Sequence, residues 1–197
     1  MNRGNVRVDL KDIYISVDIE SSGPIPGAYS LLSIGACVVG NSGEEFYVEI
    51  QPVNEAYVPE AIEVAGKSMK EFALSGQPPE SAMSSFRDWL GMISSEGSAI
   101  FVGFNAAFDW SFINWYFHTY VGENPFGIGG IDIKSFYMGM SGCSWEDTRS
   151  SHIPAKFKGR SPHTHNALDD AKEQAEMFQL MLRASSDLKS AHNRVEQ

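Results

Sequence analysis

Two acidic residues, Asp18 and Glu20, stand two positions apart at the end of an apolar run. Residues 13 to 19 of this run alternate isoleucine or valine with other residue types, which is the period-two pattern of a β-strand. Side chains two positions apart on a strand leave the same face, about 7 Å apart along the chain at a rise of about 3.3 Å per residue. An exposed strand end is the simpler interpretation of such a pair, and a cation held between two carboxylates is the other.

Another acid, Asp109, comes shortly after a second apolar run, residues 99 to 104. It lies near the start of the following helix, where the backbone dipoles stabilise a carboxylate. Asp109 alone could be an ordinary helix-start aspartate. Asn105, just past the expected strand, either hydrogen-bonds a neighbouring acid or caps this helix.

A third acidic segment combines a histidine with two aspartates. His165 lies at the mouth of the last expected helix, and Asp169 and Asp170 lie one turn inside it. At about 100° per residue, Asp170 falls closer than Asp169 to the apolar stripe of this helix. Asp170 is therefore the better candidate for an interior ligand, whereas Asp169 fits an acid that complements the helix dipole.

Four carboxylates and a histidine are the residue types that two-metal phosphodiester hydrolysis needs. Hard cations about 3.5–4 Å apart stabilise the attacking and leaving oxygens in such a site. Carboxylates suit Mg²⁺ or Mn²⁺ as ligands. A histidine, with an unperturbed pKa of about 6.5, can take a proton from the attacking water at working pH. The residue types allow metal binding by the acids and proton transfer by the histidine, but their spacing does not establish these roles.

The elements that must position these side chains are expected to form one mixed sheet with helices on its faces. Gly40-Asn41-Ser42-Gly43 is expected to join two of the strands as a hairpin. The expected strands are residues 13–19, 31–39, 45–50, 99–104 and 131–133, and the expected helices are one opened by Pro78-Pro79, residues 106–120 and residues 166–183. This order predicts an α/β fold with a five-stranded sheet. Residues 1–184 are expected to form one domain, and the polar residues 185–197 a frayed tail.

The composition of the chain limits the kinds of nucleic-acid partner and the cellular setting that we expect. The net charge of −10 argues against a protein that coats long stretches of nucleic acid, because that binding comes mostly from Lys and Arg. An enzyme that binds only a few terminal nucleotides can instead obtain the positive charge at its site from bound divalent ions. Cys37 and Cys143 form no CxxC pattern, which favours a reduced, cytoplasmic setting. No run approaches the roughly 18 apolar residues of a membrane span, and the N-terminus lacks a signal-peptide pattern.

Three motifs, taken together, resemble the DEDD exonuclease superfamily in its histidine-bearing branch of DnaQ-like and ribonuclease T-like enzymes. They occur in the family's order, at family-like separations, between residues 13 and 178. The motifs are Val17-Asp18-Ile19-Glu20 with Ser22-Gly23, Asn105-Ala106-Ala107-Phe108-Asp109 and His165-Asn166-Ala167-Leu168-Asp169-Asp170-Ala171, and Leu32-Ser33-Ile34-Gly35-Ala36 is similar to the family's second strand.

The resemblance implies an RNase H-like fold and a complete set of catalytic positions. It gives the role of metal ligand, for two Mg²⁺ or Mn²⁺ ions, to Asp18, Glu20, Asp109 and Asp170. It gives the role of general base to His165. It also selects Asp170 over Asp169, because the family pattern places four residues between the histidine and the aspartate.

The resemblance further suggests contacts with the terminal nucleotide. The family's first motif usually carries threonine where this chain has Ser21 and Ser22, a departure that affects substrate contacts rather than chemistry. Tyr29 either stacks on a base or packs within its loop. The candidate substrate contacts are Ser22, Gly23, Tyr29, Leu31 and Asn105.

The expected activity is that of a metal-dependent 3′-5′ exonuclease, which releases nucleoside 5′-monophosphates from the 3′ end of single-stranded nucleic acid. The sequence leaves RNA and DNA open. One alternative is a phosphodiesterase of oligonucleotides or dinucleotides. Another is a catalytically silent nucleic-acid-binding module, which would be expected to lack an acid or the histidine. Residues 110 to 120 are apolar nearly all round, which favours either burial on several sides or a homodimer interface.

Overall fold

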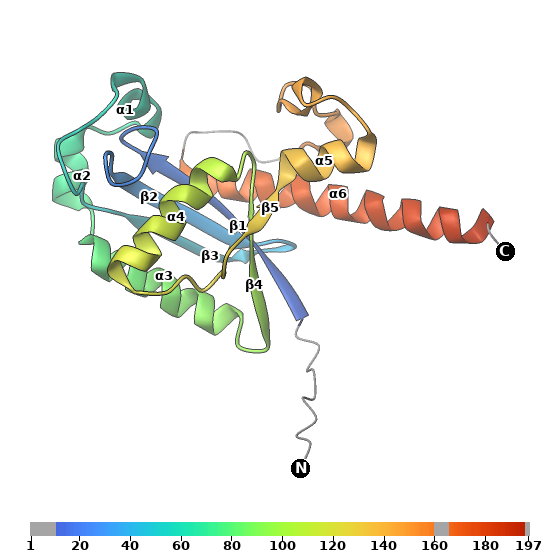
Figure 1. Ribbon diagram of the computed structural model, residues 1–197, viewed down its shortest axis with the longest axis horizontal. Helices are drawn as coiled ribbons and strands as arrows, with labels where there is room; N and C mark the ends of the chain where they lie inside the picture. Colours follow the sequence, from blue (N-terminus) through green and yellow to red (C-terminus); the bar gives the residue numbers. More distant parts are fainter. Residues whose placement is uncertain (1–10, 160–165, 196–197) are drawn as a thin grey trace, which may run out of the picture.

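The structure is a computed structural model of the chain, and it describes residues 11–159 and 166–195, with side chains as far as Asp187 (Figure 1). It contains a five-stranded sheet in the order β3-β2-β1-β4-β5. The strands are β1 (Lys11–Ser21), β2 (Leu31–Val38), β3 (Asn41–Glu49), β4 (Gly97–Gly103) and β5 (Gly130–Asp132). The pairs β1-β2 and β2-β3 are antiparallel, whereas β1-β4 and β4-β5 are parallel. The mixed five-stranded sheet predicted from the sequence is confirmed.

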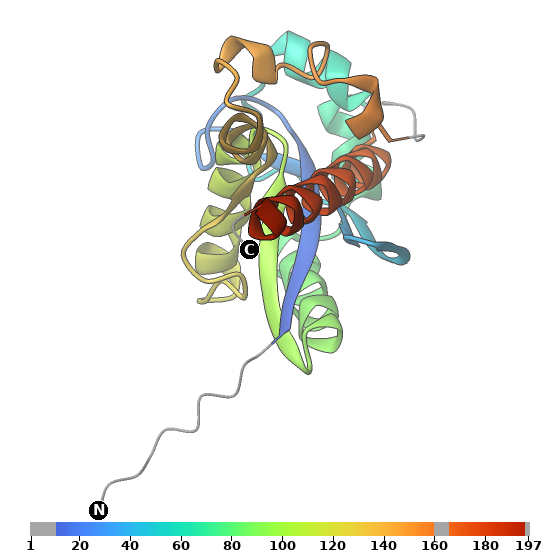
Figure 2. The ribbon, with the colours of Figure 1, turned by 90° about the vertical axis from the view of Figure 1, so that its right-hand side faces the viewer.

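The two faces of the central strand β1 have different neighbours. Ile15, Val17 and Ile19 are buried in the core that α3 (Pro79–Ile93) and α4 (Ala107–Tyr120) also form. The alternate residues, including Asp18 and Glu20, therefore face the opposite side of the sheet. That side is covered by α6 (Ala167–Val195), which lies against β1 and β2 and is seen nearly end-on in Figure 2.

The second core lies between the sheet, α6 and α5 (Ile133–Ser141). It contains Val102 of β4, Ile133 and Tyr137 of α5, and Phe178 of α6. Two short 3-10 turns, Glu146–Thr148 and Ala155–Phe157, follow α5 and return the chain towards α6. The sheet is thus covered by helices on both faces.

The apolar character of α4 is explained by packing within the chain. Phe112, Ile113, Tyr116 and Phe117 are fully buried against the sheet and α3. The partly buried aromatic side chains of the helix pack against the same core. Burial on several sides therefore accounts for the pattern, and the homodimer stays a prediction.

Some elements differ from those expected from the sequence. The helices α1 (Pro59–Ala65), α2 (Met69–Ser75) and α5 were not predicted, because seven to nine residues give too few turns for a clear helical period. β3 begins at Asn41, so that its first residues replace most of the expected hairpin loop. α6 continues beyond Arg183 to Val195, through a stretch without glycine or proline.

No described helix is both long and apolar enough to cross a membrane. The cytoplasmic setting and the domain limit at residue 184 stay predictions.

Gly35 in β2 allows the first turn of α6 to lie directly on the sheet. It is the ladder partner of Asp18 in β1. A Cβ atom at this position would overlap the carbonyl group of Ala167 and the backbone nitrogen of Leu168. Only glycine therefore lets α6 begin here, three residues before Asp170.

Replacing Gly35 with alanine should destabilise the protein by about 1–3 kcal/mol, as is typical of overpacked sites, because the new methyl group meets rigid backbone. Denaturant unfolding measures this change. Gly91→Ala in α3 is the matched control, since no atom lies within 4 Å of its added Cβ. That substitution should stabilise the helix by about 0.5–1 kcal/mol. Equal unfolding midpoints for Gly35→Ala and the unaltered protein would show that the helix start does not depend on this glycine.

Candidate active site

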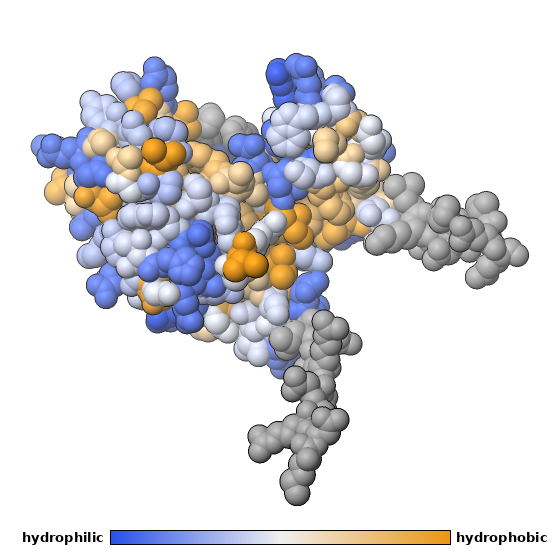
Figure 3. All heavy atoms as spheres, viewed as in Figure 1, coloured by the Kyte–Doolittle hydropathy of each residue, from blue (hydrophilic) through white to orange (hydrophobic). Residues whose placement is uncertain are grey.

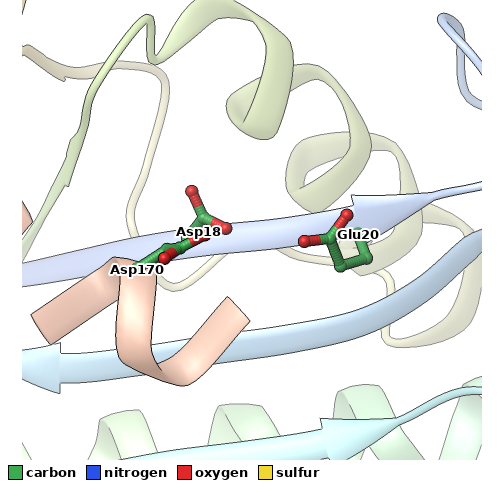
Figure 4. A group of neighbouring side chains, drawn as sticks. All are labelled: Asp18, Glu20 and Asp170. Carbon is green, nitrogen blue, oxygen red and sulfur yellow. The ribbon is translucent and has the colours of Figure 1, made fainter. Parts of the chain in front are cut away.

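Three carboxylates from two elements meet on the α6 side of the sheet (Figure 4). One oxygen each from Asp18, Glu20 and Asp170 lies within 4.8 Å of the other two. Asp18 and Glu20 come from the end of β1, and Asp170 comes from the first turn of α6. A hard divalent cation bonds to oxygens at about 2.0–2.6 Å, so one ion can lie between all three.

The start of α6 is fixed by a cap, which sets the position of Asp170. The side-chain oxygen of Asn166 accepts hydrogen bonds from the backbone N–H groups of Leu168 at 3.0 Å and Asp169 at 3.4 Å. Asp170 is buried, at 4% exposure, whereas Asp169 is partly exposed. The fold thus brings Asp170, rather than Asp169, to the acids of β1.

Asp109, in the first turn of α4, lies against the backbone of the same strand. Its Oδ1 accepts a hydrogen bond of 3.2 Å from the N–H of Ile19, the residue between Asp18 and Glu20. Its side chain is buried, at 5% exposure. Asp109 is not one of the three acids whose oxygens lie within 4.8 Å of one another.

The electrostatics of the cluster disfavour negative charge. Burial, followed by repulsion from Asp170 and Asp109, raises the pKa of Glu20 to about 8. Burial and the neighbouring acids Asp109, Glu20 and Asp170 raise the pKa of Asp18 well above its usual value. Burial also raises the pKa of Asp109 to about 7, although the hydrogen bond from Ile19 opposes this rise. An all-oxygen donor set in which negative charge is costly fits hard divalent cations.

His165 directly precedes the cap residue Asn166 in the sequence, and it lies outside the described residues. Its role as general base therefore stays a prediction, which rests on the resemblance of its motif to the exonuclease family.

The loop after β1 is held by the side chains that were predicted to contact substrate. The hydroxyl of Ser22, which is fully buried, donates to the carbonyl of Ala56 at 2.8 Å and accepts from the N–H of Ser30 at 2.9 Å. A Cβ atom at Gly23 would overlap the ring of Tyr29. Tyr29 therefore packs within its loop, and its stacking on a base stays a prediction.

The other two predicted contacts, Leu31 and Asn105, differ in their surroundings. Leu31 is buried, and its N–H donates to the hydroxyl of Tyr116 at 2.8 Å. Asn105 is exposed and has a φ of 64°, a left-handed conformation that asparagine tolerates. No side chain caps α4, so the capping role that the sequence left open for Asn105 is not observed.

Two polar side chains at the site were not found from the sequence. Gln174 donates from Nε2 to Asp18 Oδ1 at 2.6 Å, and its Oε1 accepts from the N–H of Phe104 at 2.8 Å. Its position four residues after Asp170 was the available signal, since such residues share a helix face.

Asp132 is the second residue that sequence reasoning missed. It accepts hydrogen bonds from the N–H of Ala106 at 2.9 Å and of Ser135 at 2.7 Å. It thereby caps α5 and holds the chain that leads into α4. An aspartate directly before a helical segment was the available signal for it.

The pKa of Glu20 predicts how stability depends on pH in the metal-free protein. An unfolded glutamate titrates near 4.5, whereas folded Glu20 titrates at about 8, so between these values the folded chain retains a proton that the unfolded chain has lost. Stability should therefore fall as the pH rises from about 4.5 to 8. In Glu20→Gln this contribution is absent, so the melting temperature of the variant should rise relative to the unaltered protein as the pH increases.

Melting curves in EDTA between these pH limits measure this difference. Glu63→Gln, at an exposed position of α1, is the control for the loss of a carboxylate away from the cluster. A pH-independent difference for Glu20→Gln would contradict the raised pKa.

Comparison with known proteins identifies the family. Residues 13–182 match the family model described as the 3'-5' exoribonuclease Rv2179c-like domain. The 3'-5' DNA exonuclease Cap18 of Escherichia coli is 48% identical over 180 residues, which cover 91% of this chain and 96% of that protein.

Solved structures share the fold at low sequence identity. The nuclease domain of 3'hExo, a DEDDh family member bound to rAMP, has a TM-score of 0.70 at 16% identity and covers 88% of this chain and 92% of that one. Escherichia coli Exonuclease I with a dT13 oligonucleotide has a TM-score of 0.67 at 14% identity, over 92% of this chain and 43% of that one. The predicted RNase H-like fold is confirmed. The chain belongs to the Rv2179c-like family of 3′-5′ exonucleases.

Proposed function

We propose that this exonuclease removes nucleotides one at a time from the 3′ end of single-stranded nucleic acid and uses two divalent ions, Mg²⁺ or Mn²⁺. The proposal rests on the close approach of Asp18, Glu20 and Asp170, which each place one carboxylate oxygen within 4.8 Å of the other two. Membership of a 3′-5′ exonuclease family supports the direction of cleavage. A single strand fits best, because a paired terminus would have to be unpaired before it reached a site of this kind.

In this mechanism Asp18, Glu20, Asp109 and Asp170 would hold the ions. When bound, the ions offset the charge of these acids and stabilise the attacking and leaving oxygens of the phosphodiester. Asp18 and Glu20 keep their spacing because they stand on the central strand of the sheet. His165 accepts the proton of the attacking water. The product is a nucleoside 5′-monophosphate.

A basic segment beside the site is the proposed path of the upstream strand. Ser150 lines the same cavity of about 200 Å³ as Asp170 and Gln174. The segment around Ser150 is net positive, although the whole chain carries a net charge of −10. Residues 133–159 contain four basic residues, Lys134, Arg149, Lys156 and Lys158, and two acidic residues, Glu146 and Asp147. Figure 3 shows the molecule hollowed between this part and the part that carries α1 and α2. Cationic side chains of this segment would suit the phosphates of a bound strand.

The relatives point to different nucleic acids. The family description names an exoribonuclease, whereas Cap18, which is similar over nearly its whole length, is named a DNA exonuclease. We favour single-stranded DNA, because 48% identity is a more specific relationship than family membership.

A phosphodiesterase of short oligonucleotides or dinucleotides is the alternative that the same acids would allow. Its rate would rise as the substrate shortens, whereas the proposed exonuclease should also act on long strands. A silent binding module finds little support, since all four acids and the histidine are present.

Incubation with 5′-labelled single-stranded DNA or RNA of matched sequence, with Mn²⁺ or Mg²⁺, should give a ladder of products shortened from the 3′ end. Asp170→Asn should reduce the rate by more than the 10–100-fold typical of losing a group that merely orients a metal ligand. Asp169→Asn is the matched control, one residue away and partly exposed, and should remain active. The proposal fails if neither substrate is shortened, or if shortening persists in Asp170→Asn and in EDTA. A ladder that starts from the 5′ end would contradict the polarity.

His165→Asn should lower kcat by about 10²–10⁴-fold, the usual contribution of a general base, and should leave the affinity for Mn²⁺ nearly unchanged. Single-turnover rates and Mn²⁺ titrations measure the two effects separately. His163→Asn, two residues earlier in the sequence, is the control. An unchanged kcat in His165→Asn would remove this histidine from the mechanism.

A further inference from the structure

Gln174 has both ends of its carboxamide engaged beside the acidic cluster. It lies one helical turn after Asp170 on α6 and is 9% exposed. Its Nε2 donates to Asp18 Oδ1 at 2.6 Å, and its Oε1 accepts from the N–H of Phe104 at 2.8 Å. One side chain thus joins α6, β1 and the end of β4.

The bond to Phe104 determines which end of the amide faces Asp18. A backbone N–H can only donate, so the carbonyl oxygen of the carboxamide must turn towards it. The NH₂ group must then point to Asp18, where a carboxylate accepts it. The orientation of Gln174 therefore follows from its partners, and a glutamate in its place would offer no donor when ionised.

We infer that Gln174 is a positioning residue that orients Asp18 towards the divalent ions, an inference that rests on the proposed function. Its donor fixes Oδ1 of Asp18 and so restricts the rotation of the carboxylate. Its neutral amide does this without adding another negative charge to a cluster of acids.

The hydrogen bond from the N–H of Phe104 also links Gln174 to the segment that leads to Asp109. Phe104 directly follows β4 and begins the connection that leads to Asp109 in α4. Gln174 therefore ties together the three parts of the chain that carry the proposed metal ligands. Partners that orient metal ligands in this way typically contribute 10–100-fold to metal affinity.

The test is Gln174→Met, which keeps the length of the side chain and removes the donor. Calorimetric titration of Mn²⁺ into the metal-free protein should give a Kd raised by about 10–100-fold. At saturating Mn²⁺, kcat on the single-stranded substrate should fall while KM stays unchanged. A merely structural role would lower the melting temperature but would not alter the Mn²⁺ Kd of the folded protein.

Gln179→Met is the matched control on the same helix, since Gln179 lines a different cavity with Tyr14 and Val39. If Gln174→Met does not fold, Gln174→Asn keeps the amide but is one methylene too short to reach both partners, and the same changes are expected. A Mn²⁺ Kd equal to that of the unaltered protein overturns the inference, as does an activity loss that only tracks unfolded protein. If the unaltered protein binds Mn²⁺ but shortens no nucleic acid, the proposed function fails, while the comparison of Kd values still decides the role of Gln174.

Discussion

The mutual repulsion of carboxylates at the end of β1 is the constraint that the surrounding structure must satisfy. Asp18, Glu20 and Asp170 place oxygens within 4.8 Å of one another, and the buried Asp109 lies against the same strand. Burial, followed by repulsion from Asp170 and Asp109, raises the pKa of Glu20 to about 8, so negative charge on this group is unfavourable without a counter-ion. A divalent cation converts this repulsion into attraction, so the arrangement is one that metal binding stabilises.

The scaffold holds the acids together by rigid contacts rather than by their own interactions. β1 pairs with β4 as far as Ser16 and with β2 along both of its acids, and this pairing keeps the acids at a fixed spacing. Gly35 lets the start of α6 lie on the sheet, and Asn166 caps that start, so that Asp170 stays close to Asp18. On the opposite face, the buried aromatic side chains of α4 fix the helix that carries Asp109. Backbone pairing, a helix cap and close packing thus hold the acids in place together.

The sequence predicted those features that depend on local pattern. Alternation along residues 13 to 19 gave β1 and the shared face of Asp18 and Glu20, and the helical period favoured Asp170 over Asp169. It did not reveal Gln174, because its partner Asp18 lies 156 residues away. The hydrogen bond from Ser22 to Ala56, across 34 residues, was hidden for the same reason, although it makes this serine part of the loop's support. Only tertiary structure brings such partners together.

Anomalous scattering from crystals grown with Mn²⁺ would test the central claim most directly, because it locates the ions independently of any activity. The account predicts two anomalous peaks about 3.5–4 Å apart at the end of β1, within bonding distance of Asp18, Glu20 and Asp170. Absence of a peak at this cluster, with Mn²⁺ bound at other acidic residues instead, would contradict it.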